Sequence, residues 1–225
     1  MIPGLLVILS GIFIYYSYIK QESNAWSYFL RIIFFLTSTG LILYLFEIIL
    51  GSLLVENFIL NHLLTFLIIS FAISFIIFIF IGLSKPFRKR ESIIYSKVVV
   101  SLAFFGYVIC IQGVKYFWGR VRFRELDAAF SQFTPWYLPQ GVTGFDSFPS
   151  GHAAMGWILL PLLILFTNKK PWLKYSVFVI IFLWGITLAL SRVDIGAHYS
   201  SDVLFGSFFI IITYLLIYKH YTNQT

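Results

Sequence analysis

Long runs of apolar side chains dominate this sequence, and short polar segments separate them. Leucine, isoleucine and phenylalanine fill every face of each run, so none shows the single apolar stripe of a helix on a soluble protein. A helix needs about 20 mostly apolar residues to cross a bilayer. The pattern therefore predicts an all-α transmembrane bundle with six or seven spans, at residues 2–19, 28–54, 58–84, 93–118, 152–167, 172–190 and 199–218.

The number of spans depends on the weaker runs. The run at 28–54 is the weakest candidate because it carries Glu47 and two glycines, and it could lie partly in the membrane interface. The runs at 152–167 and 172–190 are short and are joined by a tight turn. The first run lacks a basic start and a small-residue cleavage site, so we interpret it as an anchor and not as a signal peptide.

One long polar connection, at residues 119–149, interrupts the series of spans. Irregular loops of this length are uncommon in compact proteins and are often functional. The aromatic side chains between its charges could rest at the membrane interface, or the loop could gate the access of a substrate. We expect residues 1–225 to form a single membrane-embedded domain, with 119–149 as its extracytoplasmic active-site loop.

The composition supports the membrane assignment. Charged residues make up 11% of the 225 residues and hydrophobic residues 60%, whereas a soluble domain carries about a quarter charged residues. Disordered chains are poor in aromatics, but 20% of this chain is aromatic. The single cysteine, Cys110, excludes an intramolecular disulfide and a Cys-rich metal site. Lipid would cover most of the surface, so the net charge of +7 does not indicate a nucleic-acid partner.

The basic residues divide unequally between the two sides of the predicted bundle. Because successive helices alternate in direction, one side receives eleven of the sixteen: Lys20, Arg31, Lys85, Arg88, Lys89, Arg90, Lys97, Lys169, Lys170, Lys174 and Lys219. Basic residues in short loops favour the cytoplasm, so this side and the C-terminus are predicted to be cytoplasmic. The N-terminus would be outside with seven spans and inside with six.

Five basic residues reach the other side against this bias: Lys115, Arg120, Arg122, Arg124 and Arg192. Side chains that only anchor helices by snorkelling to the interface would scatter among the loops. These five cluster at three helix ends, which suggests that positive charge is required there.

Three segments on this outer side, 115–124, 148–152 and 191–202, contain the residues of an anion site. Lys115, Arg122 and Arg192 supply positive charge, and an arginine fork matches phosphate oxygens. Ser150 is a favourable N-cap, and Gly151 lets the backbone approach a ligand closely. The free N–H groups of a helix that begins there would favour a phosphate.

His198 and Asp202 add the chemistry of a nucleophile. Their i,i+4 spacing places them on one face of a helix. The carboxylate could hold one imidazole nitrogen and leave the other free to attack. His152 would be the second histidine, which donates a proton to the leaving oxygen.

The three segments resemble the signatures of the type 2 phosphatidic acid phosphatase superfamily of membrane lipid phosphatases. Those signatures are Lys-x6-Arg-Pro, Pro-Ser-Gly-His and Ser-Arg-x5-His-x3-Asp. The matching positions, in the same order, are Lys115, Arg122, Pro149, Ser150, Gly151, His152, Ser191, Arg192, His198 and Asp202. One position departs from the pattern. Phe123 stands where the first signature has a proline, which would stiffen the chain beside Arg122.

The resemblance implies a metal-independent phosphatase that needs no cofactor and forms a phosphohistidine. His198 would attack phosphorus with Asp202 orienting it, and His152 would protonate the departing group. The expected phosphate ligands are Lys115, Arg122, Ser150, Gly151 and Arg192, with Arg120 and Arg124 as possible additional substrate contacts.

The expected substrate is a phosphorylated lipid of a bacterial plasma membrane. It would belong to the undecaprenyl diphosphate or phosphatidylglycerophosphate and phosphatidate class, and the resemblance alone slightly favours the isoprenoid diphosphate. Two alternatives stay open. One is a lipid phosphotransferase that passes the same phosphohistidine to an acceptor other than water, and the other is a non-enzymatic transporter of anionic lipids. The residues carry no prediction of an oligomeric state.

Overall fold

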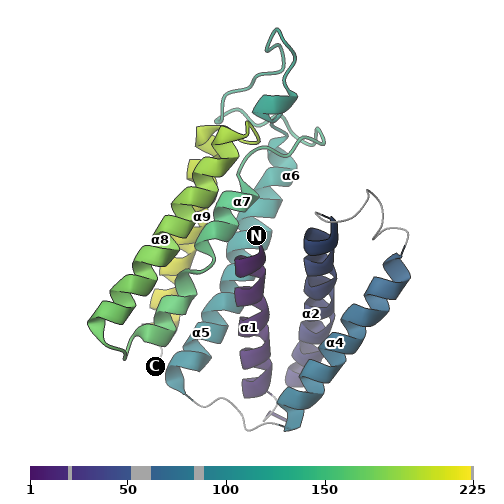
Figure 1. The fold of residues 1–225 in the computed structure, drawn as a ribbon, viewed down its shortest axis with the longest axis vertical. Helices are drawn as coiled ribbons and strands as arrows, with labels where there is room; N and C mark the ends of the chain where they lie inside the picture. Colours follow the sequence, from purple (N-terminus) through teal and green to yellow (C-terminus); the bar gives the residue numbers. More distant parts are fainter. Residues whose placement is uncertain (20–21, 52–61, 84–88, 224–225) are drawn as a thin grey trace. The chain divides into compact units, whose positions relative to one another are not determined.

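The computed structural model describes residues 1–19, 22–51, 62–83 and 89–223. All regular secondary structure in these residues is helical (Figure 1), which confirms the predicted all-α class. The predicted span ends at residues 54, 58 and 84 lie outside the described residues, as do Lys20, Lys85 and Arg88.

The chain divides into two compact units, Ile2–Lys97 and Val98–Thr225, and Met1 is grouped with the second. In the first unit, α1 (Ile2–Ile19), α2 (Ala25–Gly51) and α4 (Leu63–Leu83) pack against one another in pairs. The ring centroids of Phe35 and Phe78 lie 5.4 Å apart across α2 and α4, and Tyr16 of α1 contacts the same Phe78 at 4.3 Å. Close packing of this kind holds helices together in lipid, where no hydrophobic driving force acts between them.

Six helical segments in the described part of the chain are long and apolar enough to cross a membrane. They are α1, α2, α4, the continuous segment of α5 (Arg90–Ser101), η1 (Leu102–Gly113) and α6 (Val114–Trp118), and the helices α8 (Pro171–Asp194) and α9 (Ser200–Asn223). The run predicted as the weakest span is the regular helix α2, with 27 residues.

The predicted run at 152–167 does not form one long helix. It divides into the α-helix α7 (Gly151–Trp157) and the 3-10 helix η3 (Leu160–Phe166). Pro161 lies at the start of η3. Because proline lacks an N–H group and its ring clashes with the preceding turn, it does not continue an α-helix. The six helices long enough to span therefore include the run at 28–54, whose weakness left the predicted count open, and leave out this broken apolar segment.

In the second unit, α7 packs against α8, α9 and η1. Glycines allow the close approach of α7 and α8, since an ideal Cβ on Gly156 would lie 3.2 Å from the Cα of Gly185. Small residues at helix crossings serve this purpose in membranes. The segment η1 is a π-helix, a form found often at functional sites, and it ends two residues before Lys115.

The long loop at residues 119–149 is held by main-chain hydrogen bonds near the end of α6. Gly119 ends that helix with a φ of 63°, in the left-handed region, and an added Cβ there would lie 2.2 Å from the carbonyl oxygen of Gly141. Glycine fits both conditions. Main-chain bonds from Gln140 N to Trp118 O (2.8 Å) and from Ser147 N to Arg120 O (2.9 Å) return the loop to this point.

The predicted orientation can be tested by cysteine labelling in a Cys110→Ala background. Gln132 in the long loop and Asn168 in the turn before α8 are both exposed. A cysteine at position 132 should react with a membrane-impermeant maleimide on intact cells, and a cysteine at 168 only after the cells are opened. The reverse pattern of labelling would show that the orientation is inverted.

Candidate active site

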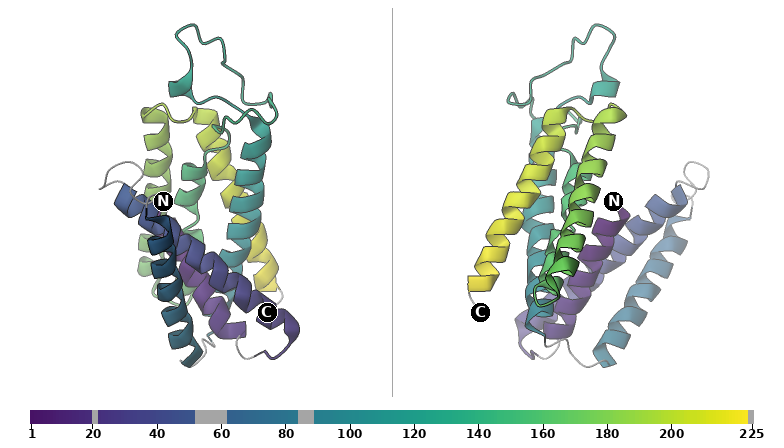
Figure 2. Two further views of the ribbon diagram at one scale, coloured as in Figure 1. Left: turned by 90° about the vertical axis from the view of Figure 1, so that its right-hand side faces the viewer. Right: turned by 60° about the vertical axis from the view of Figure 1, so that its left-hand side comes forward.

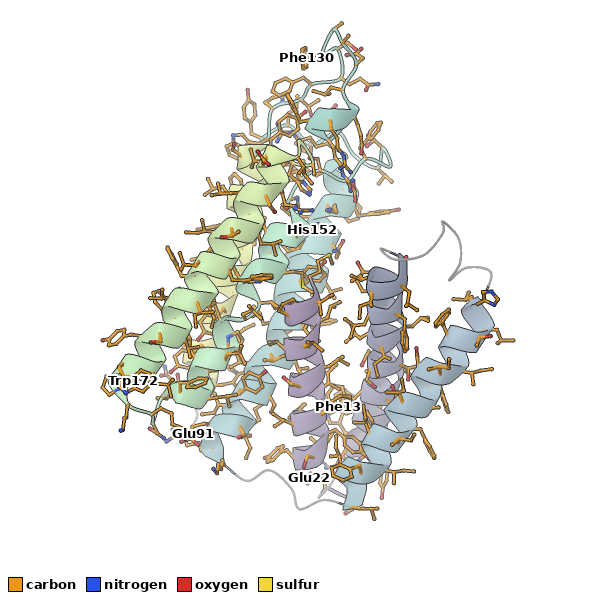
Figure 3. The ribbon with its side chains drawn as sticks, in the orientation of Figure 1. Phe13, Glu22, Glu91, Phe130, His152 and Trp172 are labelled. Carbon is orange, nitrogen blue, oxygen red and sulfur yellow. The ribbon has the colours of Figure 1, made fainter. Side chains whose placement is uncertain are left out.

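The signature segments come together at one end of the second unit. Figure 2 shows the end of α6, the start of α7 and the connection between α8 and α9 beside the long loop. His152 lies at the end of α7 nearest that loop (Figure 3). Lys115, Arg192 and His198 are all close enough to act electrostatically on charge at His152. The fold thus brings residues from four elements to one place, as the predicted topology required.

Ser150 is the N-cap of α7, as predicted from the sequence. Its Oγ accepts a hydrogen bond from the N–H of Ala153 at 3.3 Å, and its own N–H donates to the main-chain oxygen of Asp202 at 2.9 Å. Gly206 lies one turn further along α9, and an ideal Cβ there would lie 2.4 Å from the oxygen of Ser150. The first turns of α7 and α9 are therefore in direct main-chain contact, which sets the distance between two signature segments.

His198 is buried, and the main chain holds its ring. Nδ1 lies 2.7 Å from the carbonyl oxygen of Ser147 and 3.8 Å from Oδ2 of Asp202. The second distance is longer than a hydrogen bond but within the range of an ion pair. The orientation of the imidazole by Asp202 therefore stays a prediction, and the carbonyl oxygen of Ser147 is a further partner of the ring. A carbonyl oxygen only accepts, so Nδ1 carries the proton and Nε2 bears the lone pair.

The carboxylate of Asp202 is bonded to other groups. Its Oδ1 accepts from Nη1 of Arg120 at 2.5 Å, and its Oδ2 accepts from Oγ of Ser147 at 2.5 Å and from the N–H of Tyr199 at 3.1 Å. The Asp202 side chain is 0% exposed and that of Arg120 is 3% exposed. These bonds leave Oδ2 of Asp202 at ion-pair distance from His198. They also place Arg120, a possible substrate contact in the sequence, in a buried ion pair.

Lys115 and Arg122 converge on one carboxylate, that of Asp146. Nζ of Lys115 lies 3.4 Å from Oδ2 of Asp146, and Nη2 of Arg122 lies 2.7 Å from Oδ1. Burial on its own would raise the pKa of Asp146, but the charges of Lys115 and Arg122 outweigh this effect and lower the pKa. Asp146 is 47% exposed. Two of the predicted phosphate ligands therefore already share an anionic group that water can reach.

The other predicted ligands lie on separate elements of the same unit. Arg192 is half-buried in the last turn of α8, and its Nε donates to Oγ of Ser191 at 3.2 Å. Gly151 is buried at the start of α7, where an added Cβ would lie 3.4 Å from the hydroxyl of Tyr107. The side chain of Arg124 is exposed, while its N–H donates to the carbonyl oxygen of Gly196 at 2.9 Å.

Phe123, which replaces the signature proline, contacts Tyr199, the aromatic residue that lies against Arg120. Its ring lies edge-on to Tyr199 at 5.8 Å, and the guanidinium of Arg120 lies 3.8 Å from the centroid of the same Tyr199 ring. The backbone of Arg122 has φ −71° and ψ 147°, the extended conformation that a following proline favours. Arg122 therefore has the conformation that a proline at position 123 would favour, although the residue there is phenylalanine.

Sequence reasoning did not identify Ser147, Asp146, Gly206 or Tyr199 as residues of this site. A signal existed for Gly206, which follows Asp202 by four residues and so shares its helix face. The contact of Ser147 with Asp202 joins residues 55 positions apart, so it can be recognised only once the fold is known. In the described ranges, no group of three or more His, Cys, Asp or Glu could hold a metal ion.

The close contact of α7 and α9 predicts the effect of a small substitution. Gly206→Ala should lower the melting temperature in detergent, because its Cβ would push the oxygen of Ser150 away, and overpacking of this kind typically costs about 1–3 kcal/mol. Gly40→Ala is the control, since an ideal Cβ at Gly40 has nothing within 4 Å. Equal melting temperatures for the two variants would contradict the close approach seen here.

Comparison with known proteins identifies the second unit. The family model of the PAP2 superfamily matches residues 94–225. A lipid A 1-phosphatase of Rhizobium etli is 34% identical over 92 residues, which are 39% of this chain and 35% of the relative. A lipid A 1-phosphatase of Rhizobium johnstonii is 30% identical over 140 residues, 58% of this chain and 53% of the relative.

The chain thus covers between 35% and 53% of the length of these curated relatives. No solved structure shows a significant match. The family match extends over more than half of the chain and includes all three signature segments, which confirms the resemblance that the motifs indicate. This protein belongs to the PAP2 superfamily.

Proposed function

We propose that this protein is a membrane lipid phosphatase that hydrolyses a phosphoric ester or diphosphate of a lipid through a phosphohistidine at His198. The observation that carries the proposal is the bond from Nδ1 of His198 to the carbonyl oxygen of Ser147. It leaves Nε2 with a lone pair beside a second histidine and a cluster of cations. Membership of the PAP2 superfamily supports the same chemistry.

The reaction would proceed in two displacements. In the first, Nε2 of His198 forms a bond to phosphorus while the bond from phosphorus to the lipid oxygen breaks, and His152, as an imidazolium, gives that oxygen a proton. Burial and the nearby positive charges lower the pKa of His152 to about 4, so the negative charge of the bound phosphoryl group would be needed to keep the proton on its ring. In the second, His152 accepts a proton from water as the water oxygen attacks the phosphohistidine. The products are orthophosphate and the dephosphorylated lipid, and both histidines return to their starting states.

Positive charge would stabilise the phosphoryl oxygens in both transition states. A phosphoryl group bound to Lys115 and Arg122 would take the place of the Asp146 carboxylate as their partner. Arg192 would contribute from the end of α8. Ser150 and Gly151 would donate hydrogen bonds from the start of α7. The Oγ of Ser150 accepts the Ala153 amide, which leaves its hydroxyl hydrogen available.

The proposed substrates are phosphorylated lipids whose headgroups reach the extracytoplasmic face. The six apolar helices indicate an integral membrane protein, so the lipid tail can remain in the bilayer during the reaction. The two Rhizobium relatives are lipid A 1-phosphatases, which adds lipid A 1-phosphate to the classes indicated by the sequence. The panel to test therefore comprises undecaprenyl diphosphate, phosphatidylglycerophosphate, phosphatidate and lipid A 1-phosphate.

The role of His198 can be tested by substitution. His198→Ala should lower the release of orthophosphate from the best lipid substrate by a factor on the order of a thousand or more, while the melting temperature in detergent shows that the protein is folded. His220→Ala is the matched control, because His220 is an exposed histidine near the C-terminal end of α9, a helix that begins two residues after His198. Activity of His198→Ala near that of the control would rule out His198 as the nucleophile.

The fate of the phosphoryl group distinguishes a hydrolase from a phosphotransferase. Purified protein incubated with each lipid of the panel should release orthophosphate in amounts equal to the dephosphorylated lipid, because water is the proposed acceptor. Phosphorylation of a second lipid without orthophosphate would favour the transferase. Binding of the lipids with neither product would favour the anionic-lipid transporter and would contradict the proposal.

A further inference from the structure

We propose that Arg120 is a positioning residue for His198, acting through Asp202 and Ser147, and is not a phosphate ligand. The inference deepens the proposed function and rests on His198 as the nucleophile. The five outer basic residues have the same charge and lie on the same predicted side. Arg120 differs in that its side chain is buried against Asp202.

The contacts of Arg120 occupy its guanidinium from several directions. Nη1 donates to Oδ1 of Asp202 at 2.5 Å and to Oγ of Ser201 at 2.9 Å. Nε donates to the carbonyl oxygen of Thr134 at 3.0 Å. The ring of Tyr199 lies against the guanidinium at 3.8 Å. The side chain is only 3% exposed, so a phosphate could reach it only by displacing the buried carboxylate.

A continuous set of hydrogen bonds leads from this ion pair to His198. The main-chain oxygen of Arg120 accepts the N–H of Ser147 at 2.9 Å, and Oδ2 of Asp202 accepts the hydroxyl of Ser147 at 2.5 Å. Ser147 is thereby held at two of its atoms. Its third polar atom, the carbonyl oxygen, accepts from Nδ1 of His198 at 2.7 Å. The orientation of the imidazole therefore depends on Ser147, and the place of Ser147 depends on Arg120 and Asp202.

Arg122 provides the contrast within the same loop. Its side chain is 25% exposed and its partner Asp146 is 47% exposed, whereas the Arg120 side chain is 3% exposed and that of Asp202 is 0% exposed. A phosphate dianion from solution can exchange with an exposed carboxylate, because both remain hydrated in the exchange. Exchange at Arg120 would leave the Asp202 charge buried without its partner, which is strongly unfavourable.

Two readouts distinguish a positioning residue from a phosphate ligand. The first is binding of orthophosphate, measured by the rise in melting temperature with phosphate concentration, which needs no turnover. The second is kcat for orthophosphate release from a lipid substrate. Arg120→Met should retain the orthophosphate Kd within about threefold and lose kcat by about a hundredfold, whereas Arg122→Met should raise the Kd by about tenfold or more.

Three further variants complete the experiment. Arg120→Lys should regain part of the lost kcat, because it keeps the charge but not the planar fork. Ser147→Ala should lower kcat without changing the orthophosphate Kd, since it removes only the hydroxyl bond to Asp202. Lys219→Met, an exposed charge loss at the other end of α9, should match the wild type in both readouts.

Arg120→Met could fail to fold because it leaves a buried carboxylate unpaired. The double variant Arg120→Met/Asp202→Asn lacks the Asp202 carboxylate charge, so it replaces the single variant if Arg120→Met does not fold. It should bind orthophosphate like the wild type and have the kcat of Asp202→Asn alone, because residues that act in series are not additive. A further multiplicative loss of kcat in the double variant would overturn the proposal.

A Kd for orthophosphate that rises as much in Arg120→Met as in Arg122→Met would also overturn it, and Arg120 would then be a phosphate ligand. Failure of the proposed function would look different. His198→Ala would keep its turnover, or the wild type would release no orthophosphate, while the orthophosphate Kd values of the Arg120 and Arg122 variants would remain measurable.

Discussion

The buried ion pair between Arg120 and Asp202 is the interaction on which the geometry of this site depends. It joins the loop after α6 to the first turn of α9, and through Ser147 it also reaches the segment that enters α7. A buried pair adds little net stability, yet removal of one partner typically costs about 3–5 kcal/mol. The main effect of this pair is therefore to fix the positions of the segments that it joins. Arginine suits the position because its planar fork bonds Asp202 and Thr134 while its face lies on Tyr199.

This pair also marks where prediction from the sequence succeeds and where it stops. The apolar runs predict the helices well, since lipid exposure demands apolar residues on every face, and the predicted bounds of α1 are those observed. Pro161 is the one sequence feature that marks the break between α7 and η3. The signature spacing predicts which residues gather, but its position beside Arg122 made Arg120 only a possible additional substrate contact. Its contact with Asp202 joins residues 82 positions apart, and no local pattern reports the burial that gives it a different role.

Burial thus divides the outer cations into two kinds. Arg120 faces a carboxylate away from water, where the charges attract strongly and neither can be exchanged cheaply. Lys115 and Arg122 face Asp146, which is half-exposed and keeps a lowered pKa because of their charges. Such a carboxylate balances the two cations, and in the proposed reaction the phosphate of the substrate would replace it. The basic residues predicted on this side are therefore of at least two kinds: Arg120 takes part in the assembly of the site, and Lys115 and Arg122 are proposed ligands of phosphate.

The substitution of proline by Phe123 fits the same division. A proline would restrict the backbone beside Arg122, but Arg122 already has the extended conformation that a following proline favours. The phenylalanine ring instead packs on Tyr199, which lies on the guanidinium of Arg120. Excluding water from an ion pair lowers the local dielectric and strengthens the attraction between its charges. Phe123 therefore adds a ring contact to Tyr199, which lies on Arg120, while Arg122 remains extended.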